Sequence, residues 1–107
     1  NGVGLSANQI GINERVFIMV KDLEYNEILT CFNPRIVKQS SKTVVMEEGC
    51  LSYPDKFVEI ERSETVIVKY EDENKVDHKI KLEGFAARVF LHEFDHMQGI
   101  NFTQRER

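Results

Sequence analysis

Apolar and polar residues alternate along most of the chain, a pattern typical of strands with one buried face. β-branched and aromatic residues are frequent in these stretches, and short polar segments separate them. We predict strands over Arg15–Val20, Ile28–Phe32, Arg35–Lys38, Thr43–Glu48, Phe57–Glu61, Thr65–Tyr70 and Lys79–Leu82. The last two flank the polar turn Glu71–Lys75 and should form an antiparallel hairpin.

Glycine, proline and polar residues mark the expected connections between these strands. They are a glycine-containing loop over residues 1–14, turns at Asp22–Asn26 and Gln39–Lys42, a strand end at Asn33-Pro34, and an irregular segment Cys50–Lys56.

The period changes near the C-terminal end, where Phe85, Val89, Phe90, Phe94 and Met97 recur at helical spacing. We predict a helix over 85–98, because Gly99 is a natural helix stop. A short extended segment at 100–102 and a polar tail at 103–107 should follow. The expected fold is α+β, with short antiparallel β-sheets packed around one C-terminal helix, in a single domain over 1–107.

Composition is that of an ordinary globular chain, with 41% hydrophobic and 30% charged residues in 107. The net charge of −4 gives no general attraction to nucleic acid or to anionic membranes. No apolar run approaches the roughly 20 residues that span a bilayer. The chain starts at Asn1, without a methionine, so we expect a segment before it to be missing.

The most informative local motif is His92-Glu93-Phe94-Asp95-His96 within the predicted helix. Residues four apart lie on one helical face, so two imidazoles at this spacing can bind one metal ion. Glu93 follows the first histidine and can reach a water on that metal. Asp95 points away from the two-histidine face, and we expect it to pair with Arg62 or Arg88. The third histidine, His78, lies in the polar hairpin, where we expect it to be solvated and without a role.

A catalytic metal site usually has three protein ligands. Cys50, Cys31 and several carboxylates are candidates for the third, and a disulfide between the two cysteines is the alternative use of both. Cys31 lies within an apolar strand and suits a small buried side chain. Cys50 follows Gly49 at a strand end, so on chemistry we favour it. Thiolate and imidazoles suit Zn(II), Fe(II), Co(II) or Ni(II).

Three segments, taken in order, resemble the peptide deformylase family. Gly2 through Gln9 is similar to its glycine-leucine motif, which ends in glutamine. Glu48 through Ser52 is identical to its Glu-Gly-Cys-Leu-Ser motif. His92 through His96 is similar to its His-Glu-any-Asp-His motif, with Gly99 and Phe102 behind it. Three motifs in register are highly specific, and the resemblance covers essentially the whole chain.

There are departures from the family pattern. Ser6 stands where alanine is usual, and Met97 where leucine is common. Family members normally begin with a helix and some loop before the first motif, and we expect that segment to be missing here. Many bacterial members also extend into a C-terminal helix beyond the third motif, and ribosome docking by that helix is not carried over. The short tail is similar to that of truncated, phage-like members.

The resemblance implies that Cys50, His92 and His96 bind one divalent metal ion, with Fe(II) expected in the cell. Glu93 would move the proton of the attacking water. The side chain of Gln9 and the backbone N–H of Leu51 would stabilise the oxyanion. An extended peptide would lie beside Gly4 and Gly49, and its methionine side chain would fill an apolar slot. The expected substrate-binding residues are Val3, Gly4, Met46, Gly49, Phe85 and Val89, of which Met46 and Phe85 also suit core packing.

The implied function is removal of the N-formyl group from formyl-Met nascent peptides. We expect a cytoplasmic protein of a bacterium or a phage-infected host, or an organellar one after loss of a transit peptide. It should be a monomer that meets its substrate near the ribosome and binds no nucleic acid or membrane directly. The alternatives are a zinc endopeptidase of the His-Glu-any-any-His type, for which Glu106 is the sole downstream ligand candidate, and an inactive metal-binding relative.

Overall fold

The computed structural model describes residues 4–6, 15–22, 27–50 and 53–98. The elements in these residues are β1 Gly4–Ser6, β2 Val16–Asp22, β3 Glu27–Gln39, β4 Thr43–Cys50, β5 Tyr53–Ser63, β6 Thr65–Glu71, β7 Asp77–Glu83 and α1 Gly84–Met97. This arrangement confirms the predicted α+β class. In the described ranges, no helix is long and apolar enough to span a bilayer.

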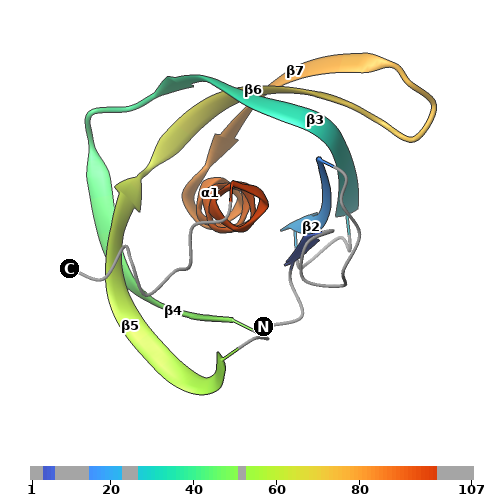
Figure 1. Cartoon of the computed structure of the whole chain (residues 1–107). Coiled ribbons are helices and arrows are strands. Elements are labelled where there is room, and N and C mark those ends of the chain that lie inside the picture. Colours follow the sequence, from blue (N-terminus) through green and yellow to red (C-terminus); the bar gives the residue numbers. More distant parts are fainter. Residues whose placement is uncertain (1–3, 7–14, 23–26, 51–52, 99–107) are drawn as a thin grey trace.

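The strands form two antiparallel sheets that lie on different sides of α1. The larger sheet has the order β1-β2-β3-β6-β7, and the smaller one consists of β4 and β5. Figure 1 shows α1 nearly end-on in the middle of the molecule, with β3, β6 and β7 on one side and β4 and β5 on the other. The helix therefore contacts strands of both sheets.

The main core lies between the five-stranded sheet and α1. Alternate residues of β6 (Val66, Val68 and Tyr70) are buried, as expected for a strand with one covered face. The core also contains an edge-to-face contact between Phe17 of β2 and Phe90 of α1, with ring centroids 5.1 Å apart. Its buried members are Phe17, Met19, Cys31, Val66, Val68, Tyr70, Leu82, Ala86, Ala87, Val89, Phe90 and Leu91.

The smaller sheet buries a different kind of face. On β5, Val58, Ile60 and Arg62 are buried, whereas Phe57, Glu59 and Glu61 are exposed. Opposite Val58 in the ladder lies Glu48 of β4, which is also buried. A charged residue on each strand thus shares the inner face with a small apolar cluster of Val58 and Ile60.

The predicted strand end at Asn33-Pro34 is wrong, since β3 runs through it for 13 residues and includes the predicted third strand. Asn33 has a φ of 49°, in the left-handed region that asparagine tolerates. The ladder register with β6 shifts between Phe32 and Arg35, as expected for a bulge that accommodates a proline. Pairing with β2 and β6 on either side therefore outweighs the local break signal.

Two other predicted connections also contain strands. Within the expected loop 1–14, Gly4–Ser6 pairs with β2 as β1. The expected irregular segment Cys50–Lys56 includes the start of β5 at Tyr53 and the end of β4 at Cys50, which pair with each other. The ring of Phe57, the ladder partner of Gly49, lies close to the backbone at Gly49. A Cβ at this position would be 2.6 Å from that ring, which accounts for the glycine.

The remaining predictions of secondary structure agree with the described elements. The strand at Arg15–Val20 appears as β2, and the turn near 40–42 separates β3 from β4. The predicted hairpin appears as β6 and β7, in register from Thr65 opposite Glu83. The predicted helix 85–98 appears as α1, which begins at Gly84, whose φ of 59° favours glycine. The predictions for 23–26 and 99–107 lie outside the described residues.

Candidate metal centre

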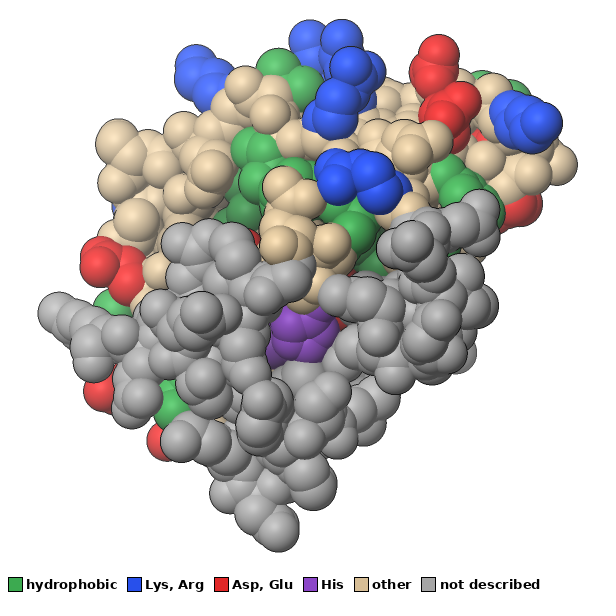
Figure 2. Space-filling model, in the orientation of Figure 1, with side chains coloured by type: hydrophobic (Ala, Val, Ile, Leu, Met, Phe, Trp, Pro, Cys, Tyr) green, Lys and Arg blue, Asp and Glu red, His purple; other side chains and the backbone are tan. Residues whose placement is uncertain are grey.

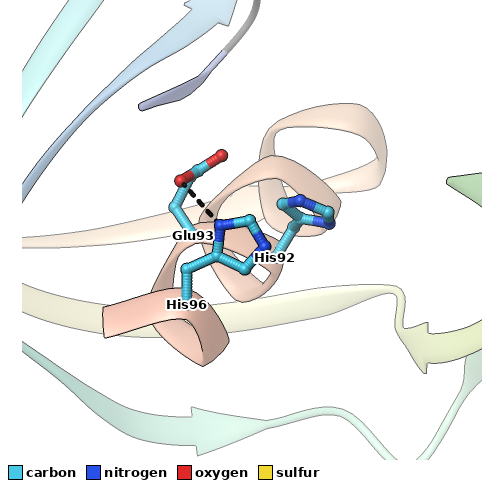
Figure 3. A group of neighbouring side chains, drawn as sticks. All are labelled: His92, Glu93 and His96. Carbon is cyan, nitrogen blue, oxygen red and sulfur yellow. Dashed lines mark ion pairs between the residues drawn. The ribbon is translucent and has the colours of Figure 1, made fainter. Parts of the chain in front are cut away.

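The two histidines of the helix motif lie side by side on α1. Their ring centroids are 4.5 Å apart, with the ring planes inclined by 56°. One potential ligand atom from each of His92, Glu93 and His96 lies within 4.8 Å of the other two. Figure 3 shows the two imidazoles next to each other and the carboxylate of Glu93 beside the ring of His96, where Nδ1 and Oε1 are 3.7 Å apart.

This cluster is buried within the fold but close to the surface. His92, Glu93 and His96 are 9%, 4% and 8% exposed. Figure 2 shows histidine atoms at the bottom of a hollow near the centre of the face that it presents. Burial, together with the neighbouring His92, lowers the pKa of His96 from 6.5 to about 4. His96 is therefore neutral at pH 7, the protonation state in which imidazole binds a metal.

Glu48 of β4 connects the smaller sheet to this helix. Its Oε1 lies 2.8 Å from Nδ1 of His92, and the guanidinium of Arg62 donates to both carboxylate oxygens, at 2.6 and 3.0 Å. Arg88 also donates to Oε2 of Glu48. Burial alone would raise the pKa of Glu48, but the hydrogen bonds from His92 and Arg62 and the charge of Arg62 lower it to about 2. The carboxylate is therefore ionised at neutral pH.

Two arginines complete this buried network of charges. Nη1 of Arg62 donates to Oδ2 of Asp95 at 2.9 Å, which confirms the pairing predicted for Asp95. Arg88 donates to the backbone oxygens of Ile60 at 3.2 Å and Val44 at 2.5 Å. Each buried charge in the network therefore has partners of the opposite charge, as buried ions require.

The donor set suits a divalent transition metal. Two imidazoles converge at the spacing expected of a helical two-histidine site. An ionised carboxylate on Nδ1 of His92 is the outer partner that histidine ligands of metals commonly have. The carboxylate of Glu93 offers an oxygen atom in the same cluster, either as a third ligand or as a proton acceptor. The described residues thus fit a metal ion of the kind that the sequence implies.

The other predicted site residues are described only in part. Val3, Gln9 and Leu51 lie outside the described residues. For Cys50 the structure describes the backbone, at the end of β4 and paired with Tyr53. Gly4 lies in β1, the outermost strand of its sheet in the described part of the chain.

The three predicted pocket residues with described side chains differ in burial. Met46 and Phe85 are 47% and 41% exposed, so the suggestion that they pack in the core is wrong. Val89, at 5% exposed, belongs to the main core. Phe85 precedes His92 by two helical turns and lies on the same side of α1. Met46 precedes Glu48 by two residues and lies on the inner face of β4.

Sequence reasoning missed the role of Glu48, Arg62 and Arg88 as a set. Glu48 was visible only as part of a motif, although two buried oxygens with three partners make it the centre of the network. The available signal was the position of this carboxylate in the sequence, two residues before the proposed ligand Cys50.

Neither Cys31 nor His78 has a role in the site predicted from the sequence, and the structure describes both residues. Cys31 is a free thiol with no exposed surface, so the suggested disulfide between Cys31 and Cys50 is wrong. Burial raises the pKa of Cys31 to about 12.

His78 is only partly solvated, because it contacts Asp72 at 2.7 Å and stacks on Tyr70.

Comparison with known proteins identifies the family. The sequence model of polypeptide deformylases matches residues 1–107, the whole of this sequence. The chain belongs to the polypeptide deformylase family. A peptide deformylase of Thermotoga maritima is 48% identical over 105 residues, which cover 98% of this chain and 62% of the relative. A chloroplastic peptide deformylase 1B of rice, Oryza sativa, is 40% identical and is covered to 40%.

Solved structures of deformylases have the same fold. The crystal structure of the Thermotoga maritima enzyme matches with a TM-score of 0.94 at 46% identity, over 100% of this chain and 71% of that one. A class I type b peptide deformylase of Acinetobacter baumannii with bound Met-Ala-Ser matches with a TM-score of 0.90 at 38% identity, over 98% and 70%. The chain thus spans about 70% of these structures and 62% of the Thermotoga sequence.

Proposed function

We propose that this chain forms the catalytic part of a metal-dependent peptide deformylase, which removes the formyl group from the N-terminal formyl-methionine of nascent peptides. The observation that carries the proposal is the buried His92–Glu93–His96 cluster in a chain of this family. A relative with bound Met-Ala-Ser, a peptide that begins with methionine, supports the substrate class. The family match over the whole sequence leaves the endopeptidase alternative without support.

His92, His96 and Cys50 are the proposed metal ligands. The neutral imidazole of His96 and the oriented ring of His92 support the first two. Cys50 is supported by its place two residues after Glu48 on β4, the strand that contacts His92. Once bound, the metal would act as a Lewis acid toward water and the formyl oxygen. The ligand set admits Fe(II), which we expect in the cell, and also Zn(II), Ni(II) and Co(II).

Glu93 is the proposed general base and acid. Its carboxylate is buried beside His96, so a water at the cluster would lie within reach of its oxygens. It would accept the proton of the attacking water and return it to the amine as the C–N bond breaks. The amide of Gln9 and the N–H of Leu51 are the proposed donors to the negative oxygen of the transition state.

The substrate is proposed to bind as an extra strand. Of the described strands, β1 is outermost in the larger sheet, and β4 pairs only with β5. An extended peptide between them could pair with the backbone at Gly4 and Gly49. The half-exposed side chains of Met46 and Phe85, together with Val89 and Val3, are proposed to hold the methionine side chain. We further propose that the protein acts as a monomer in the cytoplasm and meets its substrate near the ribosome.

The test is anaerobic purification of the full-length protein with metal analysis, followed by an assay on a formyl-Met peptide. We expect bound metal and release of formate. Glu93→Gln should retain the metal and lose about 10²–10⁴-fold in kcat/KM, the usual contribution of a general base. The exposed Glu59→Gln is the matched control and should remain fully active. A folded protein that deformylates nothing with Fe(II), Zn(II), Ni(II) or Co(II) would refute the proposal.

A further inference from the structure

One carboxylate, that of Glu48, determines how the ring of His92 is held. Its Oε1 contacts Nδ1 of His92 at 2.8 Å and Nη2 of Arg62 at 3.0 Å. Its Oε2 accepts from Nε of Arg62 at 2.6 Å and from Nη1 of Arg88. The side chain of Glu48 is 5% exposed, so these groups replace water as its surroundings.

The chemistry of these partners fixes the direction of the bond to His92. A guanidinium group only donates hydrogen bonds and keeps its charge in proteins, so two arginines require a carboxylate that only accepts. The hydrogen between Oε1 and His92 must then belong to Nδ1. In a neutral imidazole with a proton on Nδ1, the lone pair is on Nε2, which is the atom that remains for a metal.

We propose that Glu48 is a positioning residue, which holds His92 in the Nδ1–H tautomer so that Nε2 is available for the metal, and that Arg62 and Arg88 keep Glu48 in place. This inference deepens the proposed function and rests on it for the identity of the metal site. Without Glu48, either tautomer of His92 would be accessible, and the Nε2–H form cannot bind a metal through Nε2.

The arginines hold Glu48 against the same helix that carries His92. Arg62 reaches from β5 to Asp95, less than one helical turn after His92. Arg88 lies one turn before His92 and binds the backbone of both strands of the smaller sheet, at Val44 and Ile60. Glu48 is thus connected to α1 both before and after His92, which leaves its carboxylate little freedom to move.

The same contacts fix the position of β4 along the axis of α1. Cys50 lies two residues after Glu48, about 6–7 Å along a strand. Fixing Glu48 on His92 therefore also fixes where the strand that carries Cys50 ends. A single carboxylate would in this way position two of the three proposed ligands, one by direct contact and one through the backbone of β4.

The direct test is the tautomer of His92 in the metal-free, full-length protein. Ring nitrogen shifts and long-range ¹⁵N–¹H couplings distinguish the Nδ1–H from the Nε2–H form, and His78→Gln simplifies the assignment. We expect His92 to be in the Nδ1–H form in the wild-type protein. The Nε2–H form in the wild type would overturn the proposal, and this measurement needs no variant of Glu48 that folds.

The variants Glu48→Gln and Glu48→Asp test whether Glu48 is what holds His92 in the Nδ1–H tautomer. The amide can both donate and accept, so Glu48→Gln should shift His92 toward the Nε2–H form and raise the metal dissociation constant about 10–100-fold. Glu48→Asp retains a carboxylate and should recover part of both effects. The neighbouring Glu47, which is exposed, provides the control Glu47→Gln, expected to stay within about twofold of wild type.

These results separate this inference from the proposed function. A folded Glu48→Gln variant with the wild-type tautomer and wild-type affinity for Co(II) would overturn the positioning role, whatever the enzymatic activity. A wild-type protein that has the Nδ1–H tautomer and binds Co(II) but does not release formate would instead overturn the proposed function. A role for Glu48 in stability alone would lower the unfolding midpoint without changing the tautomer of His92.

Discussion

Helix α1 has two contact surfaces of opposite chemistry. Toward the five-stranded sheet it presents apolar residues, such as Phe90 and Leu91, to an apolar core. Toward β4 and β5 it presents Arg88, His92 and Asp95 to a network of buried charges. The first surface resembles any protein core, whereas the second is built from directional bonds.

This difference separates stability from positioning. Apolar burial contributes roughly in proportion to area and tolerates small shifts of the helix. A buried ionic network is a weak source of net stability, because desolvation offsets much of the attraction. Its hydrogen bonds have fixed lengths and directions, however, and can hold a ring nitrogen in one orientation. The proposed ligands lie on the side of α1 where orientation is controlled.

The largest loss of stability is expected on the apolar side. Phe90 has no exposed surface and packs edge-to-face on Phe17, so Phe90→Ala should lower the free energy of unfolding by about 3–5 kcal/mol. Denaturant titration measures the change, and Val76→Ala, at an exposed position, is the control. The folded fraction should retain the metal affinity of the wild type. A tenfold weaker affinity would mean that both surfaces position the site.

On the ionic side, Arg62→Met should cost about 3 kcal/mol, because it leaves the buried carboxylates of Glu48 and Asp95 without their shared partner. Unlike Phe90→Ala, Arg62→Met should also weaken metal binding.

Combining Arg62→Met with Asp95→Leu should lower the free energy of unfolding by less than the sum of the two single changes, by about 0.5–3 kcal/mol. Exchanging the charges of Arg62 and Asp95 should not restore stability, since Glu48 would then face a new carboxylate. Full additivity in the double-mutant cycle would contradict the network.

The two surfaces should also respond differently to acid in the metal-free protein. The pKa of Glu48 is about 2 in the fold against a reference value of 4.5, so the unfolded chain binds more protons between these values. Stability from Glu48 is present above pH 4.5 and is lost as the pH falls toward 2, on the order of 3 kcal/mol.

Measuring the free energy of unfolding of two variants as a function of pH separates the contribution of Glu48 from those of other carboxylates. The plot of this free energy against pH for Phe90→Ala should run parallel to that of the wild type, because only an apolar contact is lost. The curve of Arg62→Met should be flatter between pH 4.5 and 2, because a group that lowers the pKa of Glu48 is removed. Parallel curves for all three proteins would mean that Glu48 does not titrate as described.

The smallest effect is expected from Cys31, inside the apolar core. Burial raises the pKa of its thiol from 9.0 to about 12, so at a given pH below 9 the folded protein holds about 10³-fold less Cys31 thiolate than the unfolded chain. In a Cys50→Ser background, iodoacetamide should label Cys31 rapidly in denaturant and very slowly without it. Rapid labelling of the folded protein would indicate that this core opens readily.

The regular elements were predictable because each has its own period. The helical spacing of Phe85, Val89 and Phe90 and the alternation in the hairpin are local signals, and both elements appear as predicted. The path of β3 through Asn33-Pro34 was not predictable, because it depends on pairing with β2 and β6. Three residues, as in β1, are too few to show a period at all.

For the site, the sequence predicted the residues better than their connections. His92 and His96 are brought together by a single helical turn, so spacing alone sufficed. The helical face of Asp95 indicated that it pairs with an arginine and not with the metal, but the choice of Arg62 over Arg88 did not follow from the sequence. The bonds of Glu48 join residues 14, 40 and 44 positions apart, which no local pattern encodes.

The central claim is that one turn of α1 binds a divalent metal through His92 and His96. The most direct measurement is metal content after anaerobic purification of the wild type and of His92→Gln, His96→Gln and His78→Gln. The account predicts one bound metal per chain in the wild type and in His78→Gln, and none in either of the other variants. Full metal content in a folded His92→Gln or His96→Gln protein would contradict it.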